Sequence, residues 1–316
     1  MAFTRRRLLT GAWRSLSPDA LITPPAISPL SSLYTDIASL PRELRNSYPA
    51  LRAEHWGLSI TASRSIPLML SYADLLAMPS TEIECTLVSI GQRVGSSGIG
   101  NARWRGVALR WLLDELQPDP TLRYARVVAD DGRDVGLTKS QLERGLLAYE
   151  VNGAPLPTAL GFPVRLIVPG LYDFKMPGWV KSIEMLEHPV AGFWERRGWS
   201  ASGEIQTTSA IFPASIDICL SSPAQLRGYA FAGLHRVDAV ELSIDHGPWV
   251  SISFTPGNPG SWSLWQYTTW HPHAPGRYSV RVRATDETGF TQDEHAVDSP
   301  FPNGSSAVHQ MSITVA

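Results

Sequence analysis

The stretch GNARWRGVAL, residues 100–109, decides how the rest of the chain is interpreted. A glycine-rich loop, GSSGIG at residues 95–100, runs directly into it. A dinucleotide-binding loop reads G-x-G-x-x-G and opens a helix, whereas this loop has the reverse spacing and NARWRG does not look like a helix start. We therefore predict a structural loop here rather than a nucleotide-binding one.

Mixed strands and helices are predicted on both sides of this stretch. Apolar alternation and short buried apolar runs predict strands at residues 55–60, 82–89, 124–129, 164–168 and 180–186. Apolar stripes and helix-capping residues predict helices at residues 72–78, 109–116 and 137–146, the first of them capped by Ser71. Together these elements predict an α+β domain over residues 51–205.

The pattern changes after about residue 205. Short segments of alternating apolar residues follow, separated by turn sequences and with no predicted helix between them: residues 216–220, 228–232, 239–244, 249–254, 263–269, 278–284 and 308–315. Strands at this spacing predict an all-β immunoglobulin-like sandwich over residues 206–316. Residues 1–50 are rich in Pro, Ser and Leu without clean periodicity, so we expect an irregular N-terminal arm.

Composition and cysteine content argue against several classes of protein. The formal net charge is −2, which provides no basic field for nucleic acid. No apolar run reaches the roughly 18 residues of a membrane helix, so we expect no transmembrane segment. Only Cys85 and Cys219 are present, which excludes CxxC zinc and CxxCH haem motifs. His271 and His273 flank a proline and are not expected to converge on one metal ion.

The N-terminus contains a twin-arginine-like motif that includes Arg5 and Arg6. An export signal also needs an apolar stretch of about 7–15 residues after the charges. Here Arg14, Pro18 and Asp19 interrupt that stretch, which favours a solvated basic tail over an export signal. The sequence is compatible with either a cytoplasmic or a periplasmic location.

Several motifs, in order along the chain, resemble the sulfite oxidase family of molybdopterin oxidoreductases. GNARWRGVAL at residues 100–109 resembles the A-R-W-x-G-V-x-L signature of that family, and GFPVRLIVPG at residues 161–170 resembles the stretch beneath its cofactor. VDAVELSID at residues 237–245 and RATDETG at residues 283–289 resemble its C-terminal immunoglobulin-like domain, which often forms dimers. The resemblance covers roughly residues 50–316 and implies this two-domain fold.

The resemblance implies molybdenum held by a pyranopterin dithiolene, with one cysteine thiolate as the protein's ligand. It further implies oxygen-atom transfer to or from a small oxyanion or oxide, an external electron carrier, and a homodimer formed through the C-terminal domain. By position, it implies that Arg103 is catalytic and binds the cofactor, and that Arg165, Lys175 and Tyr172 also bind the cofactor. A pterin phosphate needs cationic partners, which these basic residues supply.

The metal-ligand position departs from the family pattern. The family reads T-L-x-C-x-S-N where this chain has TLVSIGQ, residues 86–92, so Ser89 stands at the ligand position. Cys85 lies four residues upstream, roughly 13 Å away along a strand, and does not obviously replace it. Three further differences fall around the cofactor: Leu160 in place of a histidine, Asp173 in place of a glycine and Gly178 in place of a lysine.

Two functions therefore stay open. The first is a molybdopterin-dependent oxidoreductase acting on a small molecule, with Ser89 or water as the ligand. The second is a cofactor-free relative that kept the scaffold for binding or assembly. A hydroxyl is far harder to ionise than a thiol, and Asp173 would oppose the pterin phosphate, so we expect weakened molybdenum ligation. If the cofactor is carried over, Ser89, Arg103, Arg165 and Lys175 should line one shared cleft.

Overall fold

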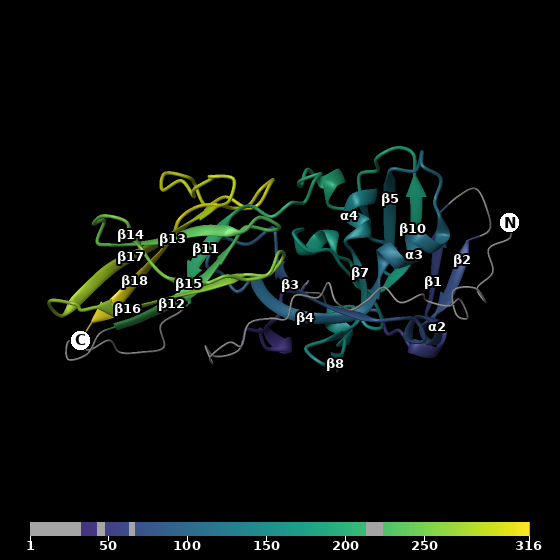
Figure 1. The fold of residues 1–316 in the computed structure, drawn as a ribbon, viewed down its shortest axis with the longest axis horizontal. Helices are drawn as coiled ribbons and strands as arrows, with labels where there is room; N and C mark the ends of the chain where they lie inside the picture. The colour runs from purple at the N-terminus through teal and green to yellow at the C-terminus, as the bar shows by residue number, and fades with distance from the viewer. Residues whose placement is uncertain (1–32, 43–47, 63–66, 213–223, 316) are drawn as a thin grey trace.

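The computed structural model of the chain describes residues 33–42, 48–62, 67–212 and 224–315. These residues form two halves that lie end to end, a mixed half that carries the described helices and a second half built of strands (Figure 1). None of the helices in the described part of the chain is long and apolar enough to cross a membrane.

The first half contains two β-sheets. One has the order β2-β1-β10-β5-β6, in which β1 and β10 are parallel and the other neighbours antiparallel. Its strands are β1 (Gly57–Thr61), β2 (Leu68–Ser71), β5 (Tyr124–Ala129), β6 (Asp134–Thr138) and β10 (Val180–Leu186). The other sheet has the order β3-β4-β7-β8, with β9 also paired to β7. Its strands are β3 (Thr81–Val88), β4 (Ile99–Ala108), β7 (Leu146–Val151), β8 (Ala154–Pro155) and β9 (Arg165–Ile167).

Short helices connect these strands. The α-helices are α2 (Tyr72–Leu76), α3 (Leu109–Leu116) and α4 (Lys139–Glu143), and the 3-10 helices are η2 (Ile37–Ser39), η3 (Ala53–His55), η4 (Thr158–Leu160), η5 (Asp173–Lys175) and η6 (Glu195–Arg197). Ser71 caps α2 as the sequence predicted, in a capping box with Asp74. The predicted helix over residues 109–116 is confirmed as α3, with Leu109, Leu112 and Leu113 buried.

The stretch at residues 100–109 forms most of β4, between β3 and β7. Trp104 is fully buried there, and its indole Nε1 donates a hydrogen bond of 3.1 Å to the carbonyl oxygen of Cys85 on β3. A side chain at Gly106 would collide with the carbonyl of Leu147 on β7, so only glycine lets the two strands approach. The buried indole of Trp104 and the lack of a side chain at Gly106 therefore fix β4 between β3 and β7.

The second half contains two four-stranded antiparallel sheets, with the orders β11-β12-β16-β15 and β14-β13-β17-β18. Both sheets contribute to one apolar core, which includes Leu226 and Trp265 from the first and Leu242, Val280 and Val282 from the second. The strands are β11 (Thr208–Ile211), β12 (Ala224–Phe231), β13 (Val237–Ile244), β14 (Val250–Ser251), β15 (Phe254–Thr255), β16 (Ser263–Trp270), β17 (Gly276–Asp286) and β18 (His309–Val315). The immunoglobulin type of this half stays a prediction.

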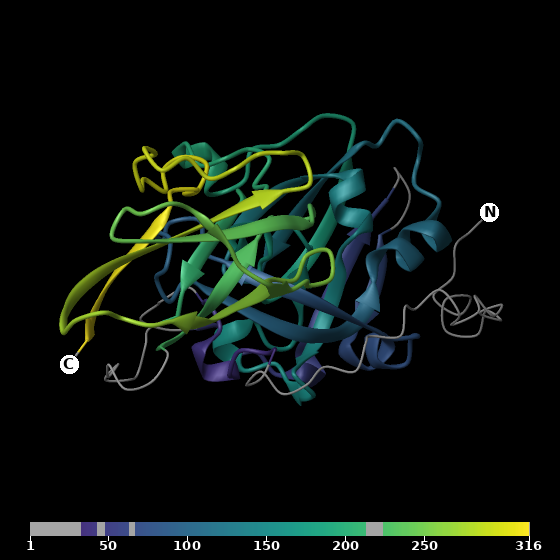
Figure 2. The ribbon, with the colours of Figure 1, turned by 60° about the vertical axis from the view of Figure 1, so that its left-hand side comes forward.

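A buried hydrogen-bond network joins the two halves. The Thr86 hydroxyl on β3 donates to the Asn101 side chain on β4 (2.9 Å) and accepts from the backbone N–H of Trp262 (2.9 Å). The Ser261 hydroxyl donates to the same Asn101 oxygen (3.1 Å), and the Thr86 N–H donates to the carbonyl of Gly260 (2.8 Å). Figures 1 and 2 both show β3 and β4 reaching toward the second half at this point.

One predicted helix differs from the structure. The predicted helix over residues 137–146 is wrong: the segment is the end of β6, the short helix α4 and the start of β7. Leu137, Leu142 and Leu146 are all buried, but each from a different element, so their helix-like spacing was accidental. The predicted strand at residues 216–220 lies outside the described residues and stays a prediction. The sequence did not single out β11, which pairs with β12.

We predict that Thr86→Val lowers the free energy of unfolding by about 1–3 kcal/mol. The change keeps the side-chain shape but leaves the buried N–H of Trp262 without its acceptor. Urea denaturation followed by tryptophan fluorescence measures the loss. Thr269→Val, on the exposed part of β16, is the matched control, with an expected change within about 0.5 kcal/mol. Equal effects of the two changes would show that the junction network does not stabilise the protein.

Candidate functional site

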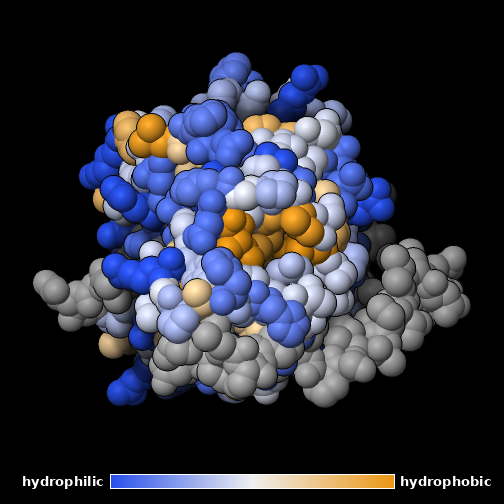
Figure 3. All heavy atoms as spheres, turned by 90° about the vertical axis from the view of Figure 1, so that its left-hand side faces the viewer, coloured by the Kyte–Doolittle hydropathy of each residue, from blue (hydrophilic) through white to orange (hydrophobic). Residues whose placement is uncertain are grey.

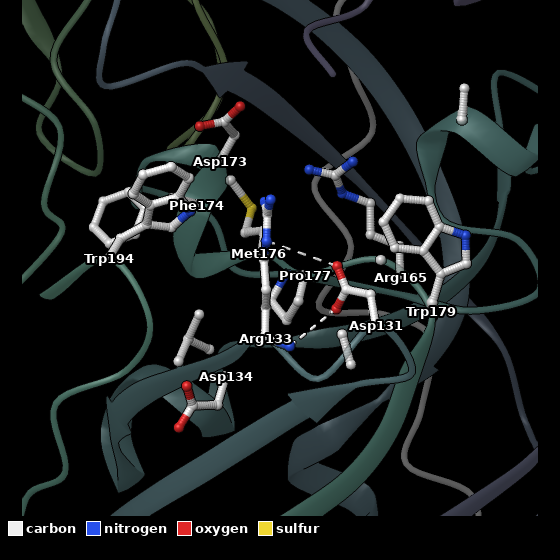
Figure 4. Close-up of a pocket in the computed structure, with 14 residues that line it drawn as sticks. Asp131, Arg133, Asp134, Arg165, Asp173, Phe174, Met176, Pro177, Trp179 and Trp194 are labelled. Atoms are coloured by element: carbon white, nitrogen blue, oxygen red, sulfur yellow. Dashed lines mark hydrogen bonds and ion pairs between the residues drawn. The ribbon is translucent and has the colours of Figure 1, made fainter. Parts of the chain in front are cut away.

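A cavity of about 50 Å³ lies in the first half, where the β5–β6 turn meets η4, the start of β9 and the segment 173–179 (Figure 4). Its charged lining residues are Asp131, Arg133, Asp134, Arg165 and Asp173. Its aromatic lining residues are Phe174, Trp179 and Trp194. The cavity therefore combines charged groups of both signs with flat apolar surfaces.

Guanidinium groups neutralise two of the three carboxylates. Asp131 accepts from the backbone N–H of Arg133 (3.1 Å) and lies 3.8 Å from its Nε. Asp134 accepts from Arg126 and Arg196, at 2.8 Å each. Burial alone would raise the pKa of Asp134, but the hydrogen bonds from Arg196 and Arg126 outweigh it and hold the pKa below its ordinary value.

Arg165 is the most enclosed cation of the cavity, at 7% exposure. One of its guanidinium nitrogens donates to the carbonyl oxygen of Leu160 at 3.3 Å. Residues 164–168 were predicted as a buried strand, and β9 confirms this over Arg165–Ile167. β9 fixes the backbone of Arg165, so the guanidinium borders the cavity from a rigid strand.

Asp173 connects this cavity to Ser89. The Ser89 hydroxyl donates a hydrogen bond of 2.7 Å to Oδ2 of Asp173, across 84 residues of sequence. Ser89 follows β3 directly, and its backbone N–H donates to the carbonyl of Gly98 at 2.8 Å. It lines a second, smaller cavity of about 30 Å³, together with Tyr172. The structure thus brings together two of the four positions at which the sequence departs from the family motif.

Lys175 lies apart from the cavity lining. Its ammonium is 1% exposed and donates to a carboxylate oxygen of Glu195 (2.6 Å) and to the carbonyls of Gly136 (2.8 Å) and Ala201 (2.7 Å). Burial lowers the pKa of Lys175, and the charge of Glu195 partly opposes that shift. All three donor positions of the ammonium are directed at protein oxygens, so its observed role is structural.

Arg103 points to the exposed surface of β4. Its side chain is 46% exposed, lies 3.8 Å from the carboxylate of Glu82 and packs over the ring of Tyr34. The expectation that four side chains line one cleft is therefore wrong: Arg165 lines the cavity, Ser89 reaches it through Asp173, and Arg103 and Lys175 do not line it. Strand alternation puts Arg103 on the face of β4 opposite its buried neighbours Ala102 and Trp104.

Tyr172 is the remaining predicted cofactor residue. Its ring is 2% exposed, and its hydroxyl accepts from the backbone N–H of Gln206 at 3.3 Å. Burial raises its pKa to about 12. Tyr172 therefore borders the space beside Ser89 as a neutral phenol.

Two of the sequence departures, Leu160 and Gly178, have a structural explanation. Leu160 is 1% exposed and belongs to the apolar core of the first half. A side chain at Gly178 would collide with the backbone of Gly161, so lysine is excluded there while these two segments touch. Cys85 is fully buried, and burial raises the pKa of its thiol to about 12.

The sequence did not identify Asp131, Arg133, Trp179 or Trp194 as site residues. The sequence predicts a turn at DDGR, which contains Asp131 and Arg133. Nothing in the local pattern indicates that this turn faces a cavity. Within the described part of the chain, no group of three or more His, Cys, Asp or Glu side chains could hold a metal ion.

Known proteins of similar sequence point to one family. Residues 45–194 match the family model of the oxidoreductase molybdopterin binding domain. The chain is 27% identical to the NADH nitrate reductase of Lotus japonicus (79% of this chain, 35% of that protein) and 25% identical to the sulfite oxidase of Gallus gallus (70% and 60%). It is 30% identical to the uncharacterized oxidoreductase YuiH of Bacillus subtilis (47% of this chain, 74% of that protein).

The chain thus spans between about a third and three quarters of the length of these curated relatives. Among solved structures, the sulfane dehydrogenase SoxCD from Paracoccus pantotrophus has a similar fold. The TM-score is 0.74 at 19% identity, over 86% of this chain and 79% of that one.

We predict that Glu195→Gln lowers the free energy of unfolding by about 3–5 kcal/mol, because it leaves the Lys175 ammonium buried opposite a neutral amide. Lys175→Met should cost a similar amount. The double variant Lys175→Met Glu195→Leu should lose much less than the sum of the single changes, since it leaves no uncompensated charge. Urea denaturation measures all three, and additive losses would contradict the ion-pair account.

Proposed function

Because this chain belongs to the sulfite oxidase-like family of molybdopterin oxidoreductases, we propose that it is a molybdopterin-dependent enzyme that transfers an oxygen atom to or from a small oxyanion or oxide. The observation that carries the proposal is the cavity of the matched domain, in which the buried guanidinium of Arg165 lies among aromatic side chains. An external carrier would take or supply the electrons.

The chemistry of the cavity fits the organic part of the cofactor. The ion pairs at its rim involve the guanidiniums of Arg126, Arg133 and Arg196 against the carboxylates of Asp131 and Asp134. The lining itself holds two guanidiniums, Arg133 and Arg165, and three carboxylates, Asp131, Asp134 and Asp173. Guanidinium is the side chain best shaped to bind a phosphate, and Arg165 is the more enclosed of the two.

The aromatic lining fits a fused heterocycle. Trp179, Trp194 and Phe174 border the same space as the cations (Figure 4). The enclosed part of the cavity, about 50 Å³, is smaller than the roughly 300–1,000 Å³ of ordinary ligand sites. Binding therefore requires the open side of the cavity and a rearrangement of the lining side chains.

The bound cofactor would supply a molybdenum centre that changes oxidation state. The chain's own residues would hold and orient it: Arg165 would pair with the phosphate, and Trp179 would cover the ring system and exclude water. The resemblance puts Ser89 at the metal-ligand position, and its hydroxyl donates to the carboxylate of Asp173, so this pair presents oxygen atoms only. Arg103 stays a proposed catalytic residue, and Lys175 and Tyr172 proposed cofactor residues, although neither Arg103 nor Lys175 borders the cavity.

One observation favours the second function, a cofactor-free relative used for binding or assembly. The Ser89 hydroxyl is already hydrogen-bonded to Asp173, so the ligand position is chemically satisfied without metal.

The end of the second half displays a group of apolar side chains surrounded by hydrophilic ones (Figure 3). We propose this face as the contact of a homodimer, which sedimentation velocity would detect.

We predict that the chain, made in a host that synthesises molybdopterin, binds pterin through Arg165. Arg165→Met should lower the bound pterin at least about tenfold, because the phosphate loses a charge-assisted partner worth about 1.5–3 kcal/mol. Fluorescence of the oxidised pterin per mole of protein measures it. Arg110→Met, which removes an exposed arginine of α3, should leave the pterin content unchanged.

The same preparations distinguish the two functions. A full equivalent of pterin on the unaltered protein supports the enzyme. If neither the unaltered protein nor Ser89→Cys binds pterin or molybdenum, the scaffold function is correct. Ser89→Cys should raise bound molybdenum relative to the unaltered chain, since a thiol ionises near neutral pH beside a metal whereas a hydroxyl does not.

A further inference from the structure

The outer wall of the cavity carries exposed arginines that the proposed cofactor site does not use. Trp194 lines the cavity, and the helix η6 follows it directly in sequence. Arg196 and Arg197 of that helix are both exposed, and neither belongs to the cavity lining. We refer to Phe193, Arg196, Arg197 and Phe301 together as the η6 face.

Arg196 shares its acidic partner with a second arginine. The carboxylate of Asp134 accepts from both Arg196 and Arg126, at 2.8 Å each. The side chain of Asp134 is 1% exposed, whereas those of Arg126 and Arg196 are 42% and 48% exposed, so solvent meets the guanidiniums and not the carboxylate. Glu184 lies opposite Arg126 in the pairing of β10 with β5, which leaves the surplus positive charge on the side of Arg196.

Arg197 is held in place without an acidic partner. Its guanidinium carbon lies 3.5 Å from the centroid of the Phe193 ring, and one of its nitrogens donates to the Phe193 carbonyl at 2.7 Å. Among the residues that the structure describes, Arg197 forms no ion pair, and the carboxylate of nearby Glu195 is buried against Lys175. Because the stack and the hydrogen bond already restrict the guanidinium, a partner would lose little side-chain entropy by binding it.

An exposed aromatic ring of the second half lies beside these arginines. Phe301 is 55% exposed, and its ring meets that of Trp199 edge-on at 5.2 Å between centroids. It also borders Gly198, the residue that follows Arg197. The η6 face thus combines an exposed apolar ring with surplus positive charge, and arginine and aromatic side chains are the types enriched in protein interfaces.

We propose that the η6 face is the docking surface of the external electron carrier, and that this carrier is a small redox protein with carboxylates around its exposed redox group. The inference rests on the proposed function and deepens it. Trp194 connects the two sites, because it lines the cavity on the side opposite Trp179 (Figure 4) and its ring meets that of Phe193 edge-on at 5.1 Å. A carrier on the η6 face therefore has its redox group beside the space assigned to the cofactor.

The composition of the face suits a partner that binds and leaves. Each oxygen atom transferred moves two electrons, so a one-electron carrier docks twice per turnover and takes or leaves one electron each time. Exposed complementary charges speed such encounters, whereas a long-lived complex needs a larger buried apolar contact. The formal net charge of the whole chain is −2, so the attraction depends on this local surplus and not on the overall charge.

The test measures binding of an acidic two-iron ferredoxin, with a basic cytochrome c as the probe of opposite charge. The oxidised ferredoxin should bind the full chain in titration calorimetry at low ionic strength, and added salt should weaken the complex. Arg197→Glu should raise the dissociation constant at least about tenfold, because a like charge replaces a complementary one. Arg197→Lys keeps the charge and should bind almost as the unaltered protein does.

Two further variants separate charge from apolar contact and from general effects. Phe301→Ser should weaken the complex to a similar extent at low and high salt, since salt does not screen an apolar contact. Arg110→Glu makes the same change of charge on the exposed surface of α3 and should alter the dissociation constant by less than about twofold. Matching circular dichroism of all variants excludes unfolding as the cause.

The possible results distinguish the docking surface from the proposed function. Equal weakening by Arg197→Glu and Arg110→Glu, or equal binding of the two probes, overturns the docking surface. Sedimentation of the protein with vesicles of anionic lipid, without binding of ferredoxin, also overturns it and assigns the η6 face to a membrane surface. A pterin-loaded chain that does not bind ferredoxin overturns the docking surface alone, whereas absence of pterin overturns the proposed function and the role of the carrier with it.

Discussion

The hydroxyl of Thr86 determines how the two halves and the site relate to each other. It donates to Asn101 and accepts from the N–H of Trp262, so a single buried side chain joins β3, β4 and the second half. Because these groups are buried, each would cost free energy if it lost its partner, and the network therefore favours one arrangement over its neighbours. Ser89 follows three residues later, so its place at the end of β3 depends on this junction.

Charge is balanced pairwise around the cavity. Asp134 has Arg126 and Arg196, Asp131 has Arg133, and Lys175 has Glu195 in a separate buried pair. Buried charges are tolerated only when compensated in this way. The ion pair between Lys175 and Glu195 fixes η5 against η6. Because η5 begins with Asp173, Lys175 helps to position Asp173 although Lys175 does not line the cavity.

The contact between Ser89 and Asp173 changes how the substitutions in the site are understood. Considered one at a time, a serine for the ligand cysteine and an aspartate for a glycine each weaken a cofactor site. In the structure the two side chains share one hydrogen bond of 2.7 Å. The remaining departures, Leu160 and Gly178, follow from apolar packing and from the close approach of Gly161, and neither introduces charge into the cavity.

The sequence by itself determined those helices and strands that depend on residues close together along the chain. The helix over residues 109–116, the strands over 124–129 and 180–186, and the Ser71 cap follow from apolar spacing and capping chemistry within a few residues. The order of motifs predicted the family, and the same motifs indicated Ser89, Tyr172 and Arg165 as site residues. Only the tertiary structure decided that Arg103 faces solvent, that Lys175 is sealed against Glu195, and that Asp173 meets Ser89. These depend on strand direction and on contacts between segments up to 84 residues apart, which no spacing along the chain encodes.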